Sequence, residues 1–217
     1  MSLPRLTIRA TLSPMSLLEW IAPEPGLTLL GQGVRLRAPR RRDYDQWARE
    51  RKASRGFLQP WEPTWSPDEL TLNAYQRRLS AWKRGREVDQ MYAFFVFRES
   101  DEALTGGITL NNVRRGVAQM GTIGYWSVQA HARQGHTLAA LRALIPFAFH
   151  QLGLHRLEAA CLPTNEASAR LLLKAGFTEE GFAKSYLKIN GEWRDHRLFG
   201  LISRETSRGH PREGLPG

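Results

Sequence analysis

The segment Gln129-Ala130-His131-Ala132-Arg133-Gln134-Gly135-His136-Thr137 decides how this chain is interpreted. It follows an apolar run that ends at Val128 and precedes an amphipathic stretch, which predicts a strand, a turn and a helix. The turn is basic and rich in amides, and Gly135 lets the backbone come close to a ligand. Because the first amides of a helix are free and lie at the positive end of its dipole, an anion-binding site is predicted. The alternative is an ordinary loop between a strand and a helix.

Outward from this segment, the chain alternates between the periodicities of strands and helices. Strands are predicted at 34–38, 92–97, 104–113, 120–128, 155–162, 182–189 and 193–202, the last two forming a hairpin around Asn190-Gly191. Helices are predicted at 43–52, 66–84, 137–152 and 165–175. Ser66-Pro67-Asp68-Glu69 has the composition of a helix start, Pro146 predicts a kink, and Gly153 and Gly176 predict helix ends.

This order of elements predicts one α/β (α+β) domain over residues 28–203. Its sheet is expected to be mixed and mostly antiparallel, with seven strands and helices on both faces. Residues 1–27 contain four prolines and no sustained periodicity, and 204–217 are polar and rich in glycine and proline. We therefore expect a flexible N-terminal extension and a disordered C-terminal tail.

Composition excludes several classes of protein. With 217 residues, 41% of them hydrophobic, the chain is long enough to bury a core. The single cysteine, Cys161, allows no internal disulfide and no multi-cysteine zinc site. The histidines show no ligand spacing, so no metal is expected. No apolar run reaches the ~20 residues of a membrane span, and Met1 to Ala10 lacks the hydrophobic core of a signal peptide. A cytoplasmic protein with no membrane association is predicted.

The net charge of +10 favours an anionic partner, and 26 of the 31 cations are arginine. Residues 1–55 carry 11 cations and 5 acids, 56–113 carry 6 and 8, and 114–203 carry 11 and 6. The excess therefore lies in two blocks on either side of an acidic middle. The first block contains Arg40-Arg41-Arg42, which is interpreted as a solvated basic face or as a weak docking patch for the ribosome or RNA.

Several motifs in register resemble the GNAT-family N-acetyltransferases, and within them the RimJ/RimL group that acetylates the N-termini of ribosomal proteins. The family's acetyl-CoA loop is matched in part by Ala132-Arg133-Gln134-Gly135-His136-Thr137. The longer stretches that carry the resemblance are Arg55-Gly56-Phe57-Leu58-Gln59-Pro60-Trp61-Glu62-Pro63, Gly124-Tyr125-Trp126, Asn165 with Ser168, Ala175-Gly176-Phe177 and Asn190-Gly191-Glu192-Trp193-Arg194-Asp195-His196. The resemblance covers about Thr28 to Ile202. It implies a GNAT-like sheet whose strands splay at the acetyl-CoA site.

The resemblance also implies which residues hold acetyl-CoA, the expected cosubstrate. The amides of Gln134, Gly135, Thr137 and Leu138 would bind the pyrophosphate, with Arg133 and His136 beside them. Main-chain groups near Ser127 and Val128 would pair with the pantetheine arm, one N–H serving as oxyanion donor. Because main-chain groups supply most of these contacts, the side chains of the loop can differ from the family's motif without loss of binding.

Asn165 and Ser168 are further candidates for holding acetyl-CoA, and Ser168 is also the candidate for the general acid. Many members of the family carry an acid tyrosine seven residues after the position of Asn165, where this chain has Leu172. Ser168 lies on the same helix face as Leu172 and resembles the serine proposed as the acid in the ribosomal-protein branch. A thiolate leaving group needs only a weak donor, because a thiol pKa is near ~8.5. The alternative for Asn165 is a helix cap alone.

Glu62 and Asp195 are the candidates for the general base. An α-amino group has a pKa of about 7.7–8.0, against about 10.4 for lysine, so a modest carboxylate or a water linked to one suffices. Glu62 is equally well explained as a loop carboxylate that caps an amide or pairs with an arginine. For Asp195, a salt bridge to Arg194 or Arg197 in the hairpin is the favoured explanation.

The acceptor site is expected to have an aromatic rim of Phe57, Trp61, Trp65 and Tyr186, although aromatic side chains more often only bury area. Cys161 lies in a strand expected to be buried, so direct transfer in a ternary complex is predicted. The expected acceptor is a protein N-terminus, ribosomal proteins included. A small-molecule amine is the alternative acceptor, and a ribosome- or RNA-associated protein without turnover is the alternative function. Monomer and homodimer both remain open.

Overall fold

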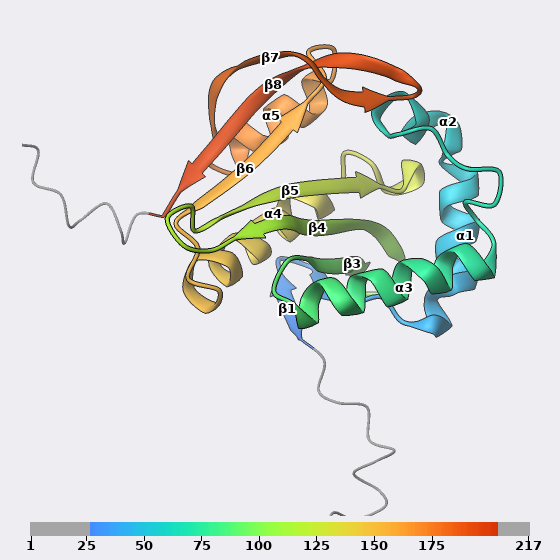
Figure 1. Ribbon diagram of the computed structural model, residues 1–217. Coiled ribbons are helices and arrows are strands. Elements are labelled where there is room, and N and C mark those ends of the chain that lie inside the picture. The colour runs from blue at the N-terminus through green and yellow to red at the C-terminus, as the bar shows by residue number, and fades with distance from the viewer. Residues whose placement is uncertain (1–26, 204–217) are drawn as a thin grey trace, which may run out of the picture.

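The computed structural model describes residues 27–203, so the extensions predicted at 1–27 and 204–217 lie outside the described residues apart from Leu27. An open sheet has the order β1-β2-β3-β4-β5-β6-β8-β7, and all neighbours are antiparallel except the parallel pair β5 and β6 (Figure 1). The strands are β1 (Thr28–Gly31), β2 (Val34–Arg37), β3 (Tyr92–Arg98), β4 (Leu104–Arg114), β5 (Met120–Ser127), β6 (Arg156–Cys161), β7 (Thr178–Ile189) and β8 (Glu192–Ile202). The predicted α/β class and mostly antiparallel sheet are confirmed.

The sheet has eight strands, one more than the seven predicted. The additional strand is β1, which pairs with β2 in a hairpin whose turn residue Gly33 has a φ of +68°. Four residues are too few to show the alternation that identifies a strand, and β1 directly follows the proline-containing segment assigned to the extension. Pairing with β2 and burial of Leu29 stabilise strand β1, although its local sequence does not predict a strand.

Helices cover both faces of the sheet, as predicted: in Figure 1, α3 crosses in front of it and α4 lies behind it. The helices are α1 (Tyr44–Ala53), α2 (Arg55–Leu58), α3 (Leu72–Glu87), α4 (His136–Pro146) and α5 (Glu166–Lys174). Alternate residues of β3 show how the two layers are filled. Phe94 and Val96 pack with α4 and α5 in the larger core, whereas Phe95 and Phe97 pack with Trp47 of α1 and residues of α3.

The predicted start of a helix at Ser66 is wrong. Residues 67–70 form a turn, and α3 begins at Leu72, where the side chain of Thr71 caps it by accepting a hydrogen bond from the amide of Ala74. Asp68 and Glu69 precede the helix and do not lie in its first turn. They pair with Arg77 and Arg78 of α3. A second cap five residues downstream thus replaces the one predicted.

Two sequence signals near the site are confirmed. Pro146, which has no N–H to donate, ends the α-helical part of α4, and a π-helical turn continues over Phe147–Gln151 to the stop at Gly153. Asn190 and Gly191 both have positive φ, +45° and +86°, as a two-residue hairpin turn between β7 and β8 requires. No helix within residues 27–203 has the length and apolarity needed to cross a membrane.

Candidate active site

The candidate active site begins where β5 and β6 separate. The two strands pair only over Met120↔Arg156, Gly121↔Leu157 and Thr122↔Glu158, after which β5 continues to Ser127 and diverges from β6 (Figure 1). The sheet therefore opens near its middle, and the far half of β5 has an edge that β6 does not cover. This is the splay between strands predicted from the sequence.

Hydrogen bonding in β5 determines which main-chain groups point into this gap. The amide of Val128 donates to the carbonyl of Thr105 at 2.9 Å, and the register with β4 continues unbroken to Thr109↔Gly124. Because main-chain groups alternate between the two edges of a strand, those of Tyr125 and Ser127 face the gap. The sequence predicts an oxyanion donor among the N–H groups near Ser127 and Val128. The N–H of Ser127 faces the gap, whereas the N–H of Val128 is already bonded to Thr105.

The N-terminus of α4 adjoins the gap and has no side-chain cap. Gly135 occupies the cap position with a φ of +85°, a left-handed conformation that favours glycine, and Arg133 before it has a φ of +62°. The side chain of Gln134 donates to the carbonyl of Ala130 at 3.1 Å, which folds the turn back on itself. The first amides of α4 are therefore free to bind an anion, as the sequence predicted.

A cleft of about 1000 Å³ opens at this helix end and is called here the α4 cleft. Its lining includes Gly31, Gln32 and Gly33 of the β1–β2 hairpin, Gln134, Gly135, His136 and Leu138 of the turn and helix, and the basic side chains Arg98 and Arg142. Ser127 is tied to the same helix, since its hydroxyl lies 2.8 Å from that of Thr137. The end of β5 is thus fastened to the first turn of α4.

Two histidines in the turn have nitrogens without a partner. The Nδ1 atoms of His131 and His136 are buried and make no hydrogen bond within the described part of the chain, and the two rings are 6.2 Å apart. Burial, with the nearby charges of Arg98 and His131, lowers the pKa of His136. A neutral imidazole beside the α4 cleft results.

Ser168 faces the gap from the other side. Asn165 caps α5 by accepting the amide of Ser168 at 3.0 Å, and the hydroxyl of Ser168 lies 2.7 Å from the phenol of Tyr125 on β5. Burial raises the pKa of Tyr125. Leu172, the position at which many relatives carry a tyrosine, is fully buried in the core. A phenol from β5 and a hydroxyl from α5 therefore meet across the splayed strands.

Cys161, at the end of β6, is 5% exposed. Burial raises the pKa of its thiol, and the hydroxyl of Ser168 only partly opposes this shift. A buried thiol with a raised pKa is a poor nucleophile.

Glu62 lies on the acceptor side of the gap in an ion pair with Arg51. Both guanidinium nitrogens of Arg51 donate to its carboxylate, at 2.9 and 2.7 Å, and the indole of Trp65 donates at 2.8 Å. The main-chain carbonyl of Glu62 accepts the amide of Asn190 at 2.9 Å, which fastens this loop to the β7–β8 hairpin. Three of about four acceptor positions on the carboxylate are thus occupied, leaving one on Oε1.

A second cleft, of about 300 Å³, lies between this loop and the hairpin and is called here the acceptor cleft. It is lined by Gly56, Gln59, Pro60 and Trp61 on one side, Ile189, Asn190 and Arg194 on the other, and Leu162 and Thr164 before α5. Of the residues predicted to form an aromatic rim, only Trp61 lines this cleft; Phe57 and Tyr186 are exposed outside its lining, and the Tyr186 ring contacts that of His196. Trp65 was expected there too, but it is buried beneath the guanidinium of Arg51, 4.5 Å from the ring centre.

Asp195 has a different partner from the one predicted. Its carboxylate accepts the amide of Ser185 at 2.8 Å, at a bulge of β7 where Ser185 has a φ of +46°. Arg194 pairs with Glu192 and Arg197 with Glu179, so the predicted salt bridge of Asp195 is wrong. Among the described residues, Asp195 and Glu62 have separate partners, and neither hydrogen bonds to Ser168.

A comparison with protein-family models agrees with the splayed sheet and the uncapped helix start described above. Residues 34–178 match the model of the acetyltransferase (GNAT) domain. The chain belongs to the GNAT acetyltransferases. It is accordingly an acyltransferase, and the enzymes of this family use acetyl-CoA.

Relatives of this acetyltransferase include probable N-acetyltransferase YjcK of Bacillus subtilis, 36% identical over 69% of this chain and 83% of the relative. The [ribosomal protein uS5]-alanine N-acetyltransferase of Escherichia coli is 32% identical over 77% of this chain and 87% of its own. The structure of Mycobacterium smegmatis RimJ in complex with CoA-disulfide is 32% identical, with a TM-score of 0.76 over 83% of this chain and 88% of that one. The resemblance to the RimJ/RimL group is therefore confirmed.

Four residues near the acetyltransferase site have no role in the sequence-based prediction. Tyr125 contacts Ser168, Arg51 holds Glu62, Arg142 lines the α4 cleft, and the buried hydroxyl of Ser54 accepts the amide of Gln129 at 2.9 Å. A polar-tipped aromatic side chain at the end of a strand is the signal that points to Tyr125. The other three depend on tertiary contacts that no local pattern encodes. Within residues 27–203, no group of three potential ligands forms a metal site.

Proposed function

We propose that this acetyltransferase transfers the acetyl group of acetyl-CoA directly to the N-terminal α-amino group of a protein, with ribosomal proteins as the favoured class. The observation that carries the proposal is the meeting of Tyr125 and Ser168 across the β5–β6 gap. The named function of the Escherichia coli relative supports this class of acceptor.

On the cosubstrate side, the residues fit a polyanion with a thioester arm. The amides of Gln134, Gly135, Thr137 and Leu138 would hold the pyrophosphate, and Arg133, His136 and Arg142 would face its phosphates. The main-chain groups of Ser127 would pair with the pantetheine arm, and its N–H is our candidate oxyanion donor in place of that of Val128. Asn165 would act by holding the first turn of α5 in position.

Ser168 is the proposed proton donor to the departing thiolate. Tyr125, in hydrogen-bond contact with it, would fix the orientation of its hydroxyl, and the serine would regain its proton from solvent. The demand on this donor is small, because a thiolate is a weak base with a pKa near ~8.5. A second alcohol beside the serine therefore compensates for the absence of the tyrosine common in the family.

Glu62 is the proposed proton acceptor, acting through a water. The free position on its Oε1 can hold such a water, and its charge favours an approaching ammonium group. Asp195 is the second candidate, but its carboxylate anchors the bulge of β7. The pH profile of kcat/KM separates the two: Glu62→Gln should remove the fall in activity at low pH that protonation of the base causes, and Asp195→Asn should leave that fall in place.

Trp61 of the acceptor cleft, with the exposed rings of Phe57 and Tyr186 outside its lining, would contact the first residues of the acceptor peptide. An extended N-terminus can reach the gap along such an open cleft, whereas a small amine would leave the exposed rim unused.

The test is thiol release from acetyl-CoA with peptides that differ only in their first residue, together with mass spectrometry of the products. A matched peptide with a blocked N-terminus but an internal lysine is the control. We expect turnover with free N-termini and none with the control. Turnover confined to polyamines or amino sugars would replace the proposed acceptor with a small molecule. Tight acetyl-CoA binding without turnover on any amine would replace catalysis with a binding role.

A further inference from the structure

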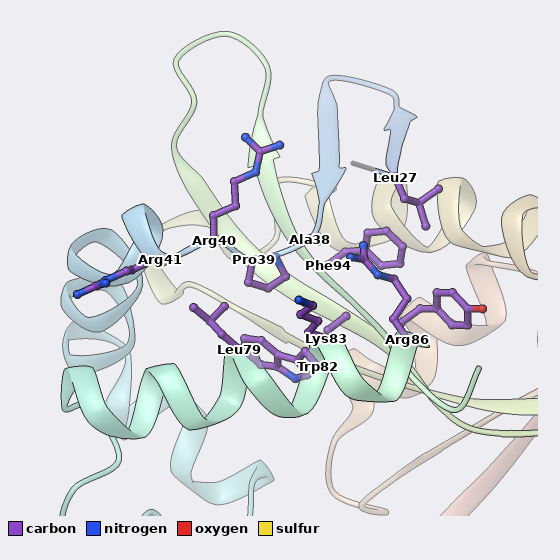
Figure 2. A pocket seen from close by; sticks show the side chains of 12 residues that line it. Leu27, Ala38, Pro39, Arg40, Arg41, Leu79, Trp82, Lys83, Arg86 and Phe94 are labelled. Atoms are coloured by element: carbon purple, nitrogen blue, oxygen red, sulfur yellow. The ribbon is translucent and has the colours of Figure 1, made fainter. Parts of the chain in front are cut away.

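A third concave region lies away from the two clefts of the acetyltransferase site and shares no lining residue with them. It has a volume of about 220 Å³ and lies between α3, the segment after β2 and the start of β3 (Figure 2). Its lining is Leu27, Ala38, Pro39, Arg40, Arg41, Leu79, Trp82, Lys83, Arg86, Tyr92, Ala93 and Phe94. This region is called here the α3 groove.

The cations of the α3 groove are unusual because they have few carboxylates beside them. Within residues 27–203, no carboxylate lies within ion-pair distance of Arg40, Arg41 or Arg86, and Lys83 has only Glu87, at 3.8 Å on the same helix. Arg77 and Arg78, earlier on the same helix, are both paired with acids. Figure 2 shows Lys83 and Arg86 extending from α3 toward Pro39 and Phe94, whereas the side chains of Arg40 and Arg41, on the opposite wall, point away from α3.

Arg40 also lies near cations that do not themselves line the groove. Partial burial and the charges of Arg37 and Arg42 lower the pKa of Arg40, although Asp43 opposes the shift. The carboxylate of Asp43 is already bound by both terminal nitrogens of Arg37, each at 2.7 Å. The positive potential of the α3 groove is thus left for a ligand to neutralise.

The floor of the groove is apolar and aromatic. Leu79 and Trp82 of α3 line it beside the cations, and Trp82 is fixed by an edge-to-face contact with Phe95 at 5.9 Å between ring centres. A half-buried indole held in this way offers a surface for stacking a flat ring.

The side chains of the groove can donate hydrogen bonds but offer almost no acceptor. No carboxylate or amide side chain lines it, and the carbonyl of Arg40 already accepts the amide of Asp43 and the phenol of Tyr75, at 3.0 and 2.8 Å. A peptide brings N–H donors that would need acceptors, whereas the phosphates of a nucleic acid only accept. The groove therefore suits a polyphosphate backbone better than an acidic peptide.

We propose that the α3 groove binds single-stranded RNA, with one base against Trp82 and adjacent phosphates at Lys83 and Arg86. These two cations lie three residues apart on one face of α3 and extend into the groove, so they can contact neighbouring phosphates (Figure 2). The half-buried indole beside them requires an unstacked base, which a duplex does not present.

The test is fluorescence anisotropy of a labelled oligouridine at several salt concentrations. Lys83→Gln combined with Arg86→Gln should weaken binding about 10-fold or more and reduce the salt slope by about 1.4, the sum for two lost phosphate contacts. The matched control is Arg42→Gln combined with Arg84→Gln, which removes the same charge from exposed neighbours that do not line the groove. The control should change binding less than about 2-fold, a surface-charge effect only.

Trp82→Leu should weaken binding about 5- to 20-fold by removing the stacking surface, and Trp82→Phe should restore much of it. All variants should acetylate a short peptide like the parent chain, which also shows that they fold. Equal losses in both double variants, equal affinity for duplex RNA, tighter binding of polyglutamate, or equal occupancy by adenosine monophosphate at the same phosphate concentration would each overturn the proposal.

Discussion

The two sides of the active-site gap are built in different ways. On the cosubstrate side, the edge of β5 and the uncapped start of α4 present main-chain groups, and Gly135 matters because it has no side chain. On the acceptor side, Arg51, Glu62 and Trp65 come together through side-chain contacts that hold a loop against a hairpin. A main-chain site tolerates changes of side chain, whereas a site built from side chains changes with each substitution. Divergence in acceptor choice should therefore concentrate on the second side.

The largest effect is expected on stability, for a substitution of Arg51 on the acceptor side of the gap. Arg51→Ala leaves the partly buried carboxylate of Glu62 without its partner and should lower the free energy of unfolding by about 3–5 kcal/mol. Arg49→Ala, in an exposed pair with Glu50, is the control and should cost less than about 1 kcal/mol. Urea unfolding measures both. Equal costs would mean that the acceptor loop does not depend on this ion pair.

Ser168→Ala should reduce kcat about 100-fold, within the range for removing a general acid, and leave the KM for acetyl-CoA nearly unchanged. Tyr125→Phe should cost about 10-fold by the same measurement, because the serine remains. The double variant should be no slower than Ser168→Ala if the two hydroxyls act as one unit. If the loss of kcat in the double variant equals the product of the two single losses, Tyr125 acts independently of Ser168.

Gly135→Ala tests the main-chain side directly. An alanine at a φ of +85° costs about 1–2 kcal/mol, and the displaced turn should raise the KM for acetyl-CoA about 10-fold. Gln134→Ala, which changes a side chain but keeps the amide, should raise it less than about 3-fold, since one neutral hydrogen bond is lost. If the two variants behave alike, side chains rather than amides bind the cosubstrate.

His136 gives the cosubstrate side a pH dependence. Its pKa in the folded chain lies below the ordinary value of 6.5, so the unfolded chain takes up a proton first as the pH falls. Stability should therefore decrease as the pH drops through 6.5 and stop decreasing below the folded pKa. His136→Gln should flatten this part of the profile in urea unfolding. An unchanged profile would show that another group is responsible.

The smallest effect is expected for Cys161→Ala. The thiol is buried and its pKa is raised, so turnover should change less than about 2-fold, an effect of packing alone. Abolished turnover, or a covalent acetyl-enzyme trapped by mass spectrometry in the parent chain but absent from the variant, would contradict direct transfer.

The same contrast explains what the sequence could predict. Periodicity, Asn190-Gly191 and Gly153 located most elements, because these signals are local. The uncapped start of α4 after Gly135 was also predictable, because the glycine and the change of periodicity are local signals. Strand β1 and the start of α3 were not, since long-range pairing and a competing cap decide them. The partners of Glu62 and Asp195 depend on contacts between distant segments, which no spacing encodes.

The short pairing between β5 and β6 has a mechanical consequence. Only three residue pairs join the block β1–β5 to the block β6–β8 within the sheet, so this seam is its weakest connection. A molecule lying along the uncovered edge of β5 would act as an additional strand and reinforce the seam. Amides of Tyr125 and Ser127 should then exchange hydrogen more slowly when the gap is filled, and the two blocks should unfold more cooperatively.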